Sequence, residues 1–146
     1  MADNYDITTA NAVFTITVTG LYNSPVTLEN YSADRAFETQ SRELAETSMS
    51  VDGYLNAGWV PNPVMQTISL QANSDSALVF EAIAAAQDTK RGLYRMGGEI
   101  QLPSTGRKYT LIRGLLRALN PIPSAGRVLE ARSFEVIWER VLPAAI

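Results

Sequence analysis

Apolar and polar residues alternate in three stretches of the chain, and this pattern predicts β-strands over 13–19, over 64–71 and near the C-terminus. Successive side chains of a strand point to opposite faces, so a period of two gathers the apolar ones on one face. The predicted apolar faces consist of Phe14, Ile16 and Val18; of Val64, Ile68 and Leu70, with Gln66 among them; and of Phe134, Val136 and Trp138. The last strand is expected over 128–141, with Ser133, Glu135 and Glu139 on its other face.

Shorter strands are predicted between turn signals. We expect one strand near 26–31, after Pro25, and another over 99–102 after a turn at Gly97-Gly98. A tight turn at 103–106 leads into a long strand over 108–119, which a break at 120–126 ends. On that strand we expect Tyr109, Leu111 and Leu115 opposite Ile112 and Leu116.

One helix is predicted, over 77–87, where alanines accompany an apolar stripe at helical spacing. The stripe is formed by Val79, Phe80, Ile83 and Ala86/Gln87, and Leu78 broadens it. The run 73–76 supplies N-cap candidates, and Gly92 is the expected end.

Residues 30–62 have no clear periodicity and carry several loop signals, including Asp52-Gly53. A long polar loop or an extended hairpin fits this segment, and residues 1–12 form a polar N-terminal arm. Because strands dominate without βα alternation, we expect one domain over 1–146. Its fold class is mainly β with one α-helix, an antiparallel β-sandwich or small barrel flanked by that helix.

The composition removes most catalytic chemistry. The chain has no cysteine and no histidine, which excludes disulfides, thiolate zinc sites and triads of the Ser-His-Asp kind. No phosphate-binding glycine motif has the required spacing, so we expect no cofactor, no metal and no catalytic residue. A carboxylate-based hydrolase remains the enzyme alternative, with Glu135 and Glu139 as its candidates, although a solvated strand face explains this pair better.

Charge is divided unevenly along the chain. Residues 1–88 hold eleven acids and two bases, a net −9, whereas residues 89–146 hold four acids and ten bases, a net +6. The two halves either pair within one subunit or steer copies into head-to-tail contact. Arg113 and Arg117 are predicted to share a strand face with Tyr109. With a pI of about 4.9, these arginines are expected to meet acidic side chains rather than nucleic acid.

No apolar run is long enough to span a membrane, so we expect no membrane insertion. The N-terminus is acidic and lacks the features of a signal peptide, which predicts synthesis and retention in the cytoplasm until assembly. Tyr54 and Trp59, with Leu55 and Val60, form an aromatic cluster that either caps the core or marks an interface.

Three ordered features carry a family resemblance. Ser50-Val51-Asp52-Gly53 follows the first alternating strand, the strand 62–71 runs through Ala72-Asn73-Ser74 into the helix, and the chain closes with a strand around Phe134–Glu139. This order resembles the tail tube proteins of long-tailed bacteriophages, particularly contractile-tailed ones. Residues 93–130 match the pattern less well, which keeps a related tube-initiating or tube-capping baseplate protein as an alternative.

The resemblance implies a structural virion protein that forms stacked, hexameric rings. Its partners would be copies of itself, the tail sheath and baseplate proteins, and double-stranded DNA that passes an acidic lumen without specific binding. The N-terminal arm and the segment 30–62 would reach a neighbouring ring. The implied inter-subunit contacts are Phe37, Glu38, Arg42, Tyr54, Leu55, Trp59 and Val60. A monomeric β-sandwich that binds ligands through Tyr54 and Trp59 remains a further alternative.

Overall fold

The structure is a computed structural model and describes residues 12–29, 31 and 36–146. The predicted arm at 1–12 therefore lies almost entirely outside the described residues. Nine strands and one helix make up the described part of the chain.

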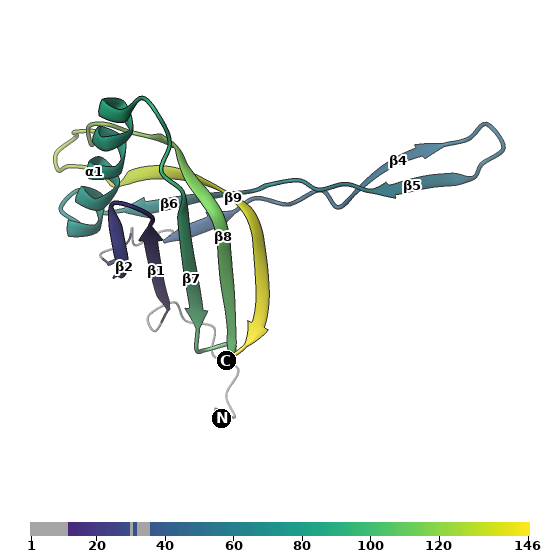
Figure 1. Cartoon of the computed structure of the whole chain (residues 1–146), viewed down its shortest axis with the longest axis horizontal. Coiled ribbons are helices and arrows are strands. Elements are labelled where there is room, and N and C mark those ends of the chain that lie inside the picture. The colour runs from purple at the N-terminus through teal and green to yellow at the C-terminus, as the bar shows by residue number, and fades with distance from the viewer. Residues whose placement is uncertain (1–11, 30, 32–35) are drawn as a thin grey trace.

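Seven strands form one antiparallel sheet in the order β2-β1-β7-β8-β9-β6-β3. Their bounds are β1 Val13–Val18, β2 Tyr22–Thr27, β3 Phe37–Thr39, β6 Val64–Leu70, β7 Met96–Leu102, β8 Arg107–Leu119 and β9 Arg132–Ala145. The sheet curls on itself (Figure 1). As a result, the ring of Phe14 on β1 lies 5.6 Å from the ring of Phe37 on the edge strand β3. The two edge strands, β2 and β3, do not pair with each other. The predicted fold class is confirmed as a sandwich-like sheet that stops short of a closed barrel.

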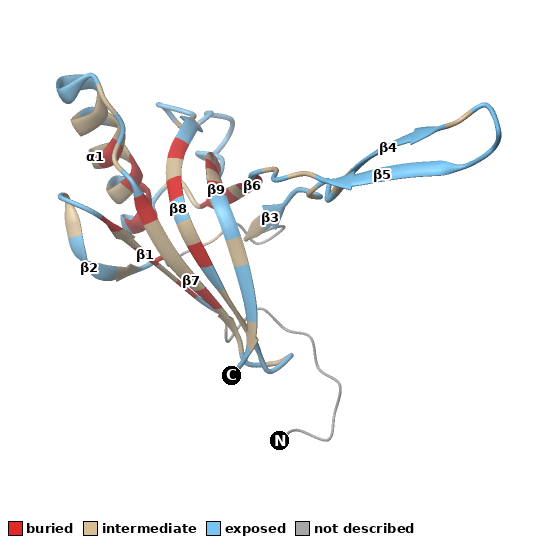
Figure 2. Ribbon diagram, turned by 45° about the vertical axis from the view of Figure 1, so that its right-hand side comes forward, coloured by how far each residue is buried: buried red, intermediate tan, exposed pale blue. Residues whose placement is uncertain are grey.

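The inside of the curl holds the core, as alternation predicted. The side chains of the three expected apolar faces, Gln66 included, are buried on β1, β6 and β9, and β9 also buries Arg132. Figure 2 shows buried segments along these strands and along the inner side of the helix. Burial of a large apolar side chain contributes about 1.5–3 kcal/mol, so this shared core is the main source of stability.

The helix, α1 (Asp75–Lys90), covers one end of the curl. Ser74 is its N-cap, and the hydroxyl oxygen of Ser74 accepts a hydrogen bond of 3.2 Å from the amide of Ser76. The ring of Phe80 stacks on Phe134 of β9 at 4.7 Å between centroids. Leu78 is 58% exposed, so its placement in the apolar stripe was wrong. The left-handed residue that ends the helix is Arg91, with φ of 55°, instead of Gly92.

Several strand boundaries differ from the prediction. β2 begins at Tyr22 and includes Pro25, which an edge strand tolerates because one side of its ladder is open. β9 begins at Arg132 and runs to Ala145, since residues 120–131 form an exposed loop.

Gly97-Gly98 was wrongly predicted as a turn, because both residues lie inside β7. A methyl group on Gly98 would meet the carbonyl oxygen of Thr15 at 2.9 Å. One on Gly114 of β8 would meet the Trp138 indole at 2.3 Å. Glycine at 114 therefore makes room for the indole, and glycine at 98 makes room for the backbone of β1.

The facing of side chains on β8 also departs from strict alternation. Arg113 has φ of 48°, an uncommon value for a residue other than glycine, and the register with β7 shifts between Met96 and Gly98. Such a bulge moves the following residues to the opposite face. As a result Leu116 is buried together with Leu111, contrary to the predicted pairing of Leu111 with Leu115.

Candidate assembly surfaces

The most prominent surface is a two-stranded ribbon that projects from the body of the molecule (Figure 1). Its strands are β4 (Ala45–Met49) and β5 (Leu55–Trp59), and Gly53, with φ of 89°, turns the chain between them. The amide of Ser50 donates to the carbonyl of Tyr54 at 2.9 Å, and Asn62 Nδ2 donates to the carbonyl of Glu43 at 2.9 Å. These bonds close the tip and the base of the ribbon. The ribbon lies within the segment 30–62, for which a loop or an extended hairpin was predicted.

The ribbon exposes large apolar side chains along its length. Figure 2 shows both strands as exposed. The side chains concerned are Leu44, Met49, Val51, Tyr54, Leu55 and Trp59. A two-stranded ribbon is at best marginally stable alone in water, and large exposed apolar groups mark interaction sites. The ribbon is therefore suited to be covered by another chain.

The seven predicted interface residues lie in two places, on the ribbon and on or beside β3. Tyr54, Leu55 and Trp59 are exposed on the ribbon, and half-buried Val60 follows them. Glu38 is exposed on β3, and Arg42 is half-buried between β3 and β4.

Phe37 lies on the inner side of β3. Its ring contacts Phe14 and also Tyr31, whose centroid is 6.1 Å away. Burial raises the pKa of the Tyr31 hydroxyl above its ordinary value, and the charge of Glu29 raises it further. That hydroxyl has no hydrogen-bond partner among the described residues.

The two edges of the sheet are a second candidate surface. β2 pairs only with β1, and β3 pairs only with β6, in the described part of the chain. Strand edges present backbone donors and acceptors that another strand can pair with. A chain with two such edges can join copies side by side.

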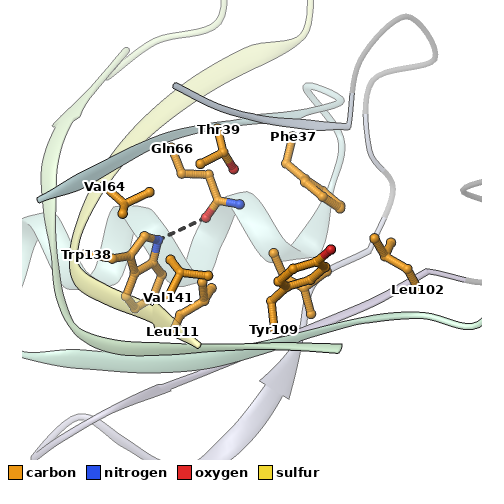
Figure 3. Close-up of a pocket in the computed structure, with 10 residues that line it drawn as sticks. Phe37, Thr39, Val64, Gln66, Leu102, Tyr109, Leu111, Trp138 and Val141 are labelled. Atoms are coloured by element: carbon orange, nitrogen blue, oxygen red, sulfur yellow. Dashed lines mark hydrogen bonds between the residues drawn. The ribbon is translucent and has the colours of Figure 1, made fainter. Parts of the chain in front are cut away.

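An apolar cavity of about 310 Å³ opens inside the curled sheet (Figure 3). Its lining comes from five strands, with α1 behind it in the view of Figure 3. The lining residues are Phe37, Thr39, Val64, Gln66, Ile100, Leu102, Tyr109, Leu111, Trp138 and Val141. The helix thus covers one part of the inner face, whereas this part remains hollow.

Gln66 is the polar group deepest in this cavity, with 1% of its surface exposed. Its Oε1 accepts a hydrogen bond of 3.0 Å from Trp138 Nε1, shown as the dashed line in Figure 3. Because the indole only donates, this bond fixes the amide orientation and leaves Nε2 as a free donor. Nε2 has no partner in the described part of the chain and faces the cavity (Figure 3).

The outer face of β8 and β9 carries paired charges. Arg117 lies 2.7 Å from Glu135, and Arg113 lies 3.8 Å from Glu139. The prediction that these arginines meet acidic side chains is confirmed. Their expected sharing of a face with Tyr109 was wrong, since Tyr109 lines the cavity and the bulge turns both arginines outward. Glu135 and Glu139 accordingly belong to a charged outer strand face, as the alternative to a hydrolase site predicted.

The described residues contain no group of three His, Cys, Asp or Glu side chains arranged to hold a metal ion. Their single helix is too short and too polar to cross a membrane.

Sequence reasoning identified the ribbon aromatics but missed the cavity. The available signal was Gln66, a polar residue on an otherwise apolar strand face. A buried amide usually has its hydrogen bonds satisfied, so its position indicated a polar partner inside the core. That this partner is Trp138, 72 residues away in sequence, depends on strand pairing that the sequence did not specify.

The fold is that of proteins from contractile injection systems. A chain from the sheath/tube terminator of the PVC extracellular contractile injection system superposes with a TM-score of 0.62 at 13% identity, over 99% of this chain and 100% of that one. A chain from the PVC sheath-tube complex gives 0.61 at 12% identity, over 99% and 95%. One from the tube-terminating cap of the anti-feeding prophage gives 0.60 at 14% identity, over 100% and 95%. At these identities the likeness concerns the fold alone.

Family membership follows from the sequence itself. No curated protein sequence matches the chain. A family model described as "Tail fiber protein gp32" matches residues 5–142, nearly the whole chain. The expected relationship to phage tail proteins is confirmed, and the chain belongs to the tail fiber protein gp32 family of phage tail structural proteins.

Proposed function

We propose that the chain is the subunit of a tail tube, in which copies close into rings and the rings stack into a conduit for DNA. The observation that carries this proposal is the apolar ribbon, which no described part of its own chain covers. A self-assembling tube needs one contact that closes a ring and another that repeats without closing. The two sheet edges are suited to the first contact and the ribbon to the second.

The remaining parts of the proposal follow from charge and composition. Rings of six copies, assembled in the host cytoplasm and carried in the virion with sheath and baseplate proteins, agree with membership in a tail protein family. A net charge of −3 favours a lumen that repels DNA phosphates instead of binding them. The proposed role is structural: the chain lacks histidine and cysteine, and the two candidate carboxylates, Glu135 and Glu139, pair with arginines on an outer strand face.

Electron microscopy of the purified protein tests the proposal directly. The wild type should form rings and tubes. A Leu55→Ser/Trp59→Ser variant should form rings that do not stack, because each lost apolar contact removes about 1.5–3 kcal/mol per subunit. The matched control is Val128→Ser/Leu129→Ser, which removes two exposed apolar side chains from the 120–131 loop and should assemble normally. A wild type that stays monomeric at high concentration would refute the tube.

A tube-capping or tube-initiating role is the second candidate. The fold agrees with it equally well, since the TM-score is 0.62 to the terminator chain and 0.61 to the sheath-tube chain. Quantitative mass spectrometry of virions separates the two roles. A tube subunit should be present in many copies per particle, and a cap in a single ring.

A further inference from the structure

The cavity in the curled sheet is incompletely filled by the described part of its own chain. Folded interiors are close-packed, with few voids larger than a water molecule, yet this cavity measures about 310 Å³. Its walls are apolar apart from Thr39, Gln66 and Tyr109. An apolar or aromatic group is therefore the occupant that the walls favour.

Gln66 adds a chemical requirement. Its Nε2 donor is buried and unpaired, while its Oε1 is held by Trp138. Leaving a buried donor unsatisfied is costly, so the occupant should bring an acceptor oxygen. A phenol combines an aromatic ring with such an oxygen.

Tyr54 has this chemistry and is 71% exposed at the tip of the ribbon. It cannot enter its own cavity. The ribbon leaves the body between Thr39 and Val64, which both line that cavity, and then runs away from it (Figure 1). Only the cavity of another copy is within its reach.

Geometry is compatible with the same pairing. Val64 and Gln66 of β6, with Thr39 of β3, line the cavity at the side of the body from which the ribbon leaves. Arg107 and Lys108 of β8 adjoin the lining residues Leu102 and Tyr109, and Glu38 and Glu99 adjoin Thr39 and Ile100. These charges balance, so the proposal depends on the apolar walls and on the unpaired donor of Gln66.

We propose that Tyr54 of one copy enters the cavity of the next copy, where its hydroxyl oxygen accepts a hydrogen bond from Gln66 Nε2. The inference rests on the proposed function, because it specifies how the ribbon joins successive rings. The contact is heterologous, with a projection on one copy and a hollow on the next, and it leaves a free projection and a free hollow at the ends. Such a contact repeats without end when its rotation does not close a ring.

The absence of cysteine allows a direct crosslinking test. Tyr54→Cys chains are mixed with Thr39→Cys chains under mild oxidation. A disulfide forms only when the two Cα atoms approach within about 7 Å. The mixture should give a crosslinked heterodimer, whereas Val51→Cys mixed with Val128→Cys should give none.

A second measurement tests the contribution of the Tyr54 hydroxyl group to stacking. The critical concentration for stacking, measured by sedimentation, should rise about tenfold in Tyr54→Phe and at least a hundredfold in Tyr54→Ser. The control Val128→Ser, which changes an exposed apolar residue of the 120–131 loop, should change it less than threefold. Because Tyr54 is exposed, these variants should fold normally, which circular dichroism checks.

The failures of the two proposals are distinguishable. Tubes that form without the Tyr54–Thr39 crosslink, with Tyr54→Phe assembling like the wild type, would overturn this inference and leave the tube intact. If the wild type forms no tubes, the proposed tube function is overturned. If concentrated free chains then also give no Tyr54–Thr39 crosslink, the contact between Tyr54 and the cavity is overturned as well. A crosslink that appears only after deletion of residues 2–11 would show that the chain's own N-terminus occupies the cavity, and would also overturn it.

Discussion

Replacing Gly114 with alanine should destabilise the fold through the Trp138 indole. The new methyl carbon would lie 2.3 Å from Trp138 Cε3 and 2.5 Å from Cζ3. Ordinary contacts between carbon atoms are about 3.5–4.0 Å, so the indole must move by more than an ångström. Trp138 is fully buried, and the open space beside it is the cavity.

The expected loss follows from three contributions. Overpacking a core costs about 1–3 kcal/mol. Movement of the indole breaks its bond to Gln66 and leaves buried polar atoms unpaired, at about 1–3 kcal/mol. Alanine returns about 0.4–1 kcal/mol by restricting the unfolded chain. The net effect should be a loss of about 3 kcal/mol in the free energy of unfolding.

Gly97→Ala is the matched control, since Gly97 also lies in the sheet. A methyl group there would meet only the Leu111 carbonyl oxygen, at 3.8 Å, so this variant should be as stable as the wild type or slightly more stable. Urea unfolding followed by circular dichroism, at equal protein concentration, measures both. With a slope of about 2 kcal/mol/M, the Gly114→Ala midpoint should fall by about 1.5 M. A Gly114→Ala midpoint at or above that of the wild type would refute this account of the packing.

Three further changes test other contacts by the same unfolding assay. Ser74→Ala removes the helix N-cap and a 2.6 Å hydrogen bond from its hydroxyl to the carbonyl of Glu29, and should cost about 1–2 kcal/mol. Glu81→Gln leaves Arg132, only 3% exposed, without the carboxylate that lies 2.5 Å from it, and should cost about 1–3 kcal/mol. Tyr31→Phe should reduce the loss of stability in alkali. The raised pKa of Tyr31 means that its contribution is complete below about pH 10, the pKa of an unfolded tyrosine, and is lost as the pH rises further.

Each of the three changes has an outcome that contradicts it. A Ser74→Ala midpoint equal to that of the wild type would remove the cap argument. Glu135→Gln, whose partner Arg117 is exposed, should cost less than about 1 kcal/mol, and an equal loss in Glu81→Gln would show that burial of Arg132 is unimportant. For Tyr31→Phe, the control is Tyr54→Phe. If both variants lose stability in alkali as the wild type does, Tyr31 is not the sensitive group.

The sequence predicted elements where local pattern and tertiary packing agree. Alternation located β1, β6 and the buried part of β9, because each presents one face to the core. It failed at Gly97-Gly98 and along β8, where the cause lies elsewhere in the chain. The indole of Trp138 requires glycine at 114, the carbonyl oxygen of Thr15 requires glycine at 98, and the bulge at Arg113 reverses the facing of the residues after it. Neither effect is visible in the local sequence around these positions.

The ribbon residues were identified for a simpler reason: Tyr54 and Trp59 lie among loop signals, and they are exposed. The cavity was not predicted, because a hollow is formed by side chains from five strands that are distant in sequence. Only the curl of the sheet brings them together.

In the proposed tube, the length of the ribbon would limit the spacing between successive rings. From Thr39 to Val51 an extended chain reaches roughly 40 Å, at about 3.3 Å per residue, so rings joined through ribbon tips cannot be spaced further apart than this. The length of the ribbon can change without altering which face each side chain is on only if an even number of residues is removed from each strand. Removing one residue from each strand would turn the side chains beyond it to the opposite face, whereas removing two from each would preserve facing and shorten the reach by about 7 Å. The spacing between rings of such a tube could thus be changed through the lengths of β4 and β5 without altering the body of the subunit.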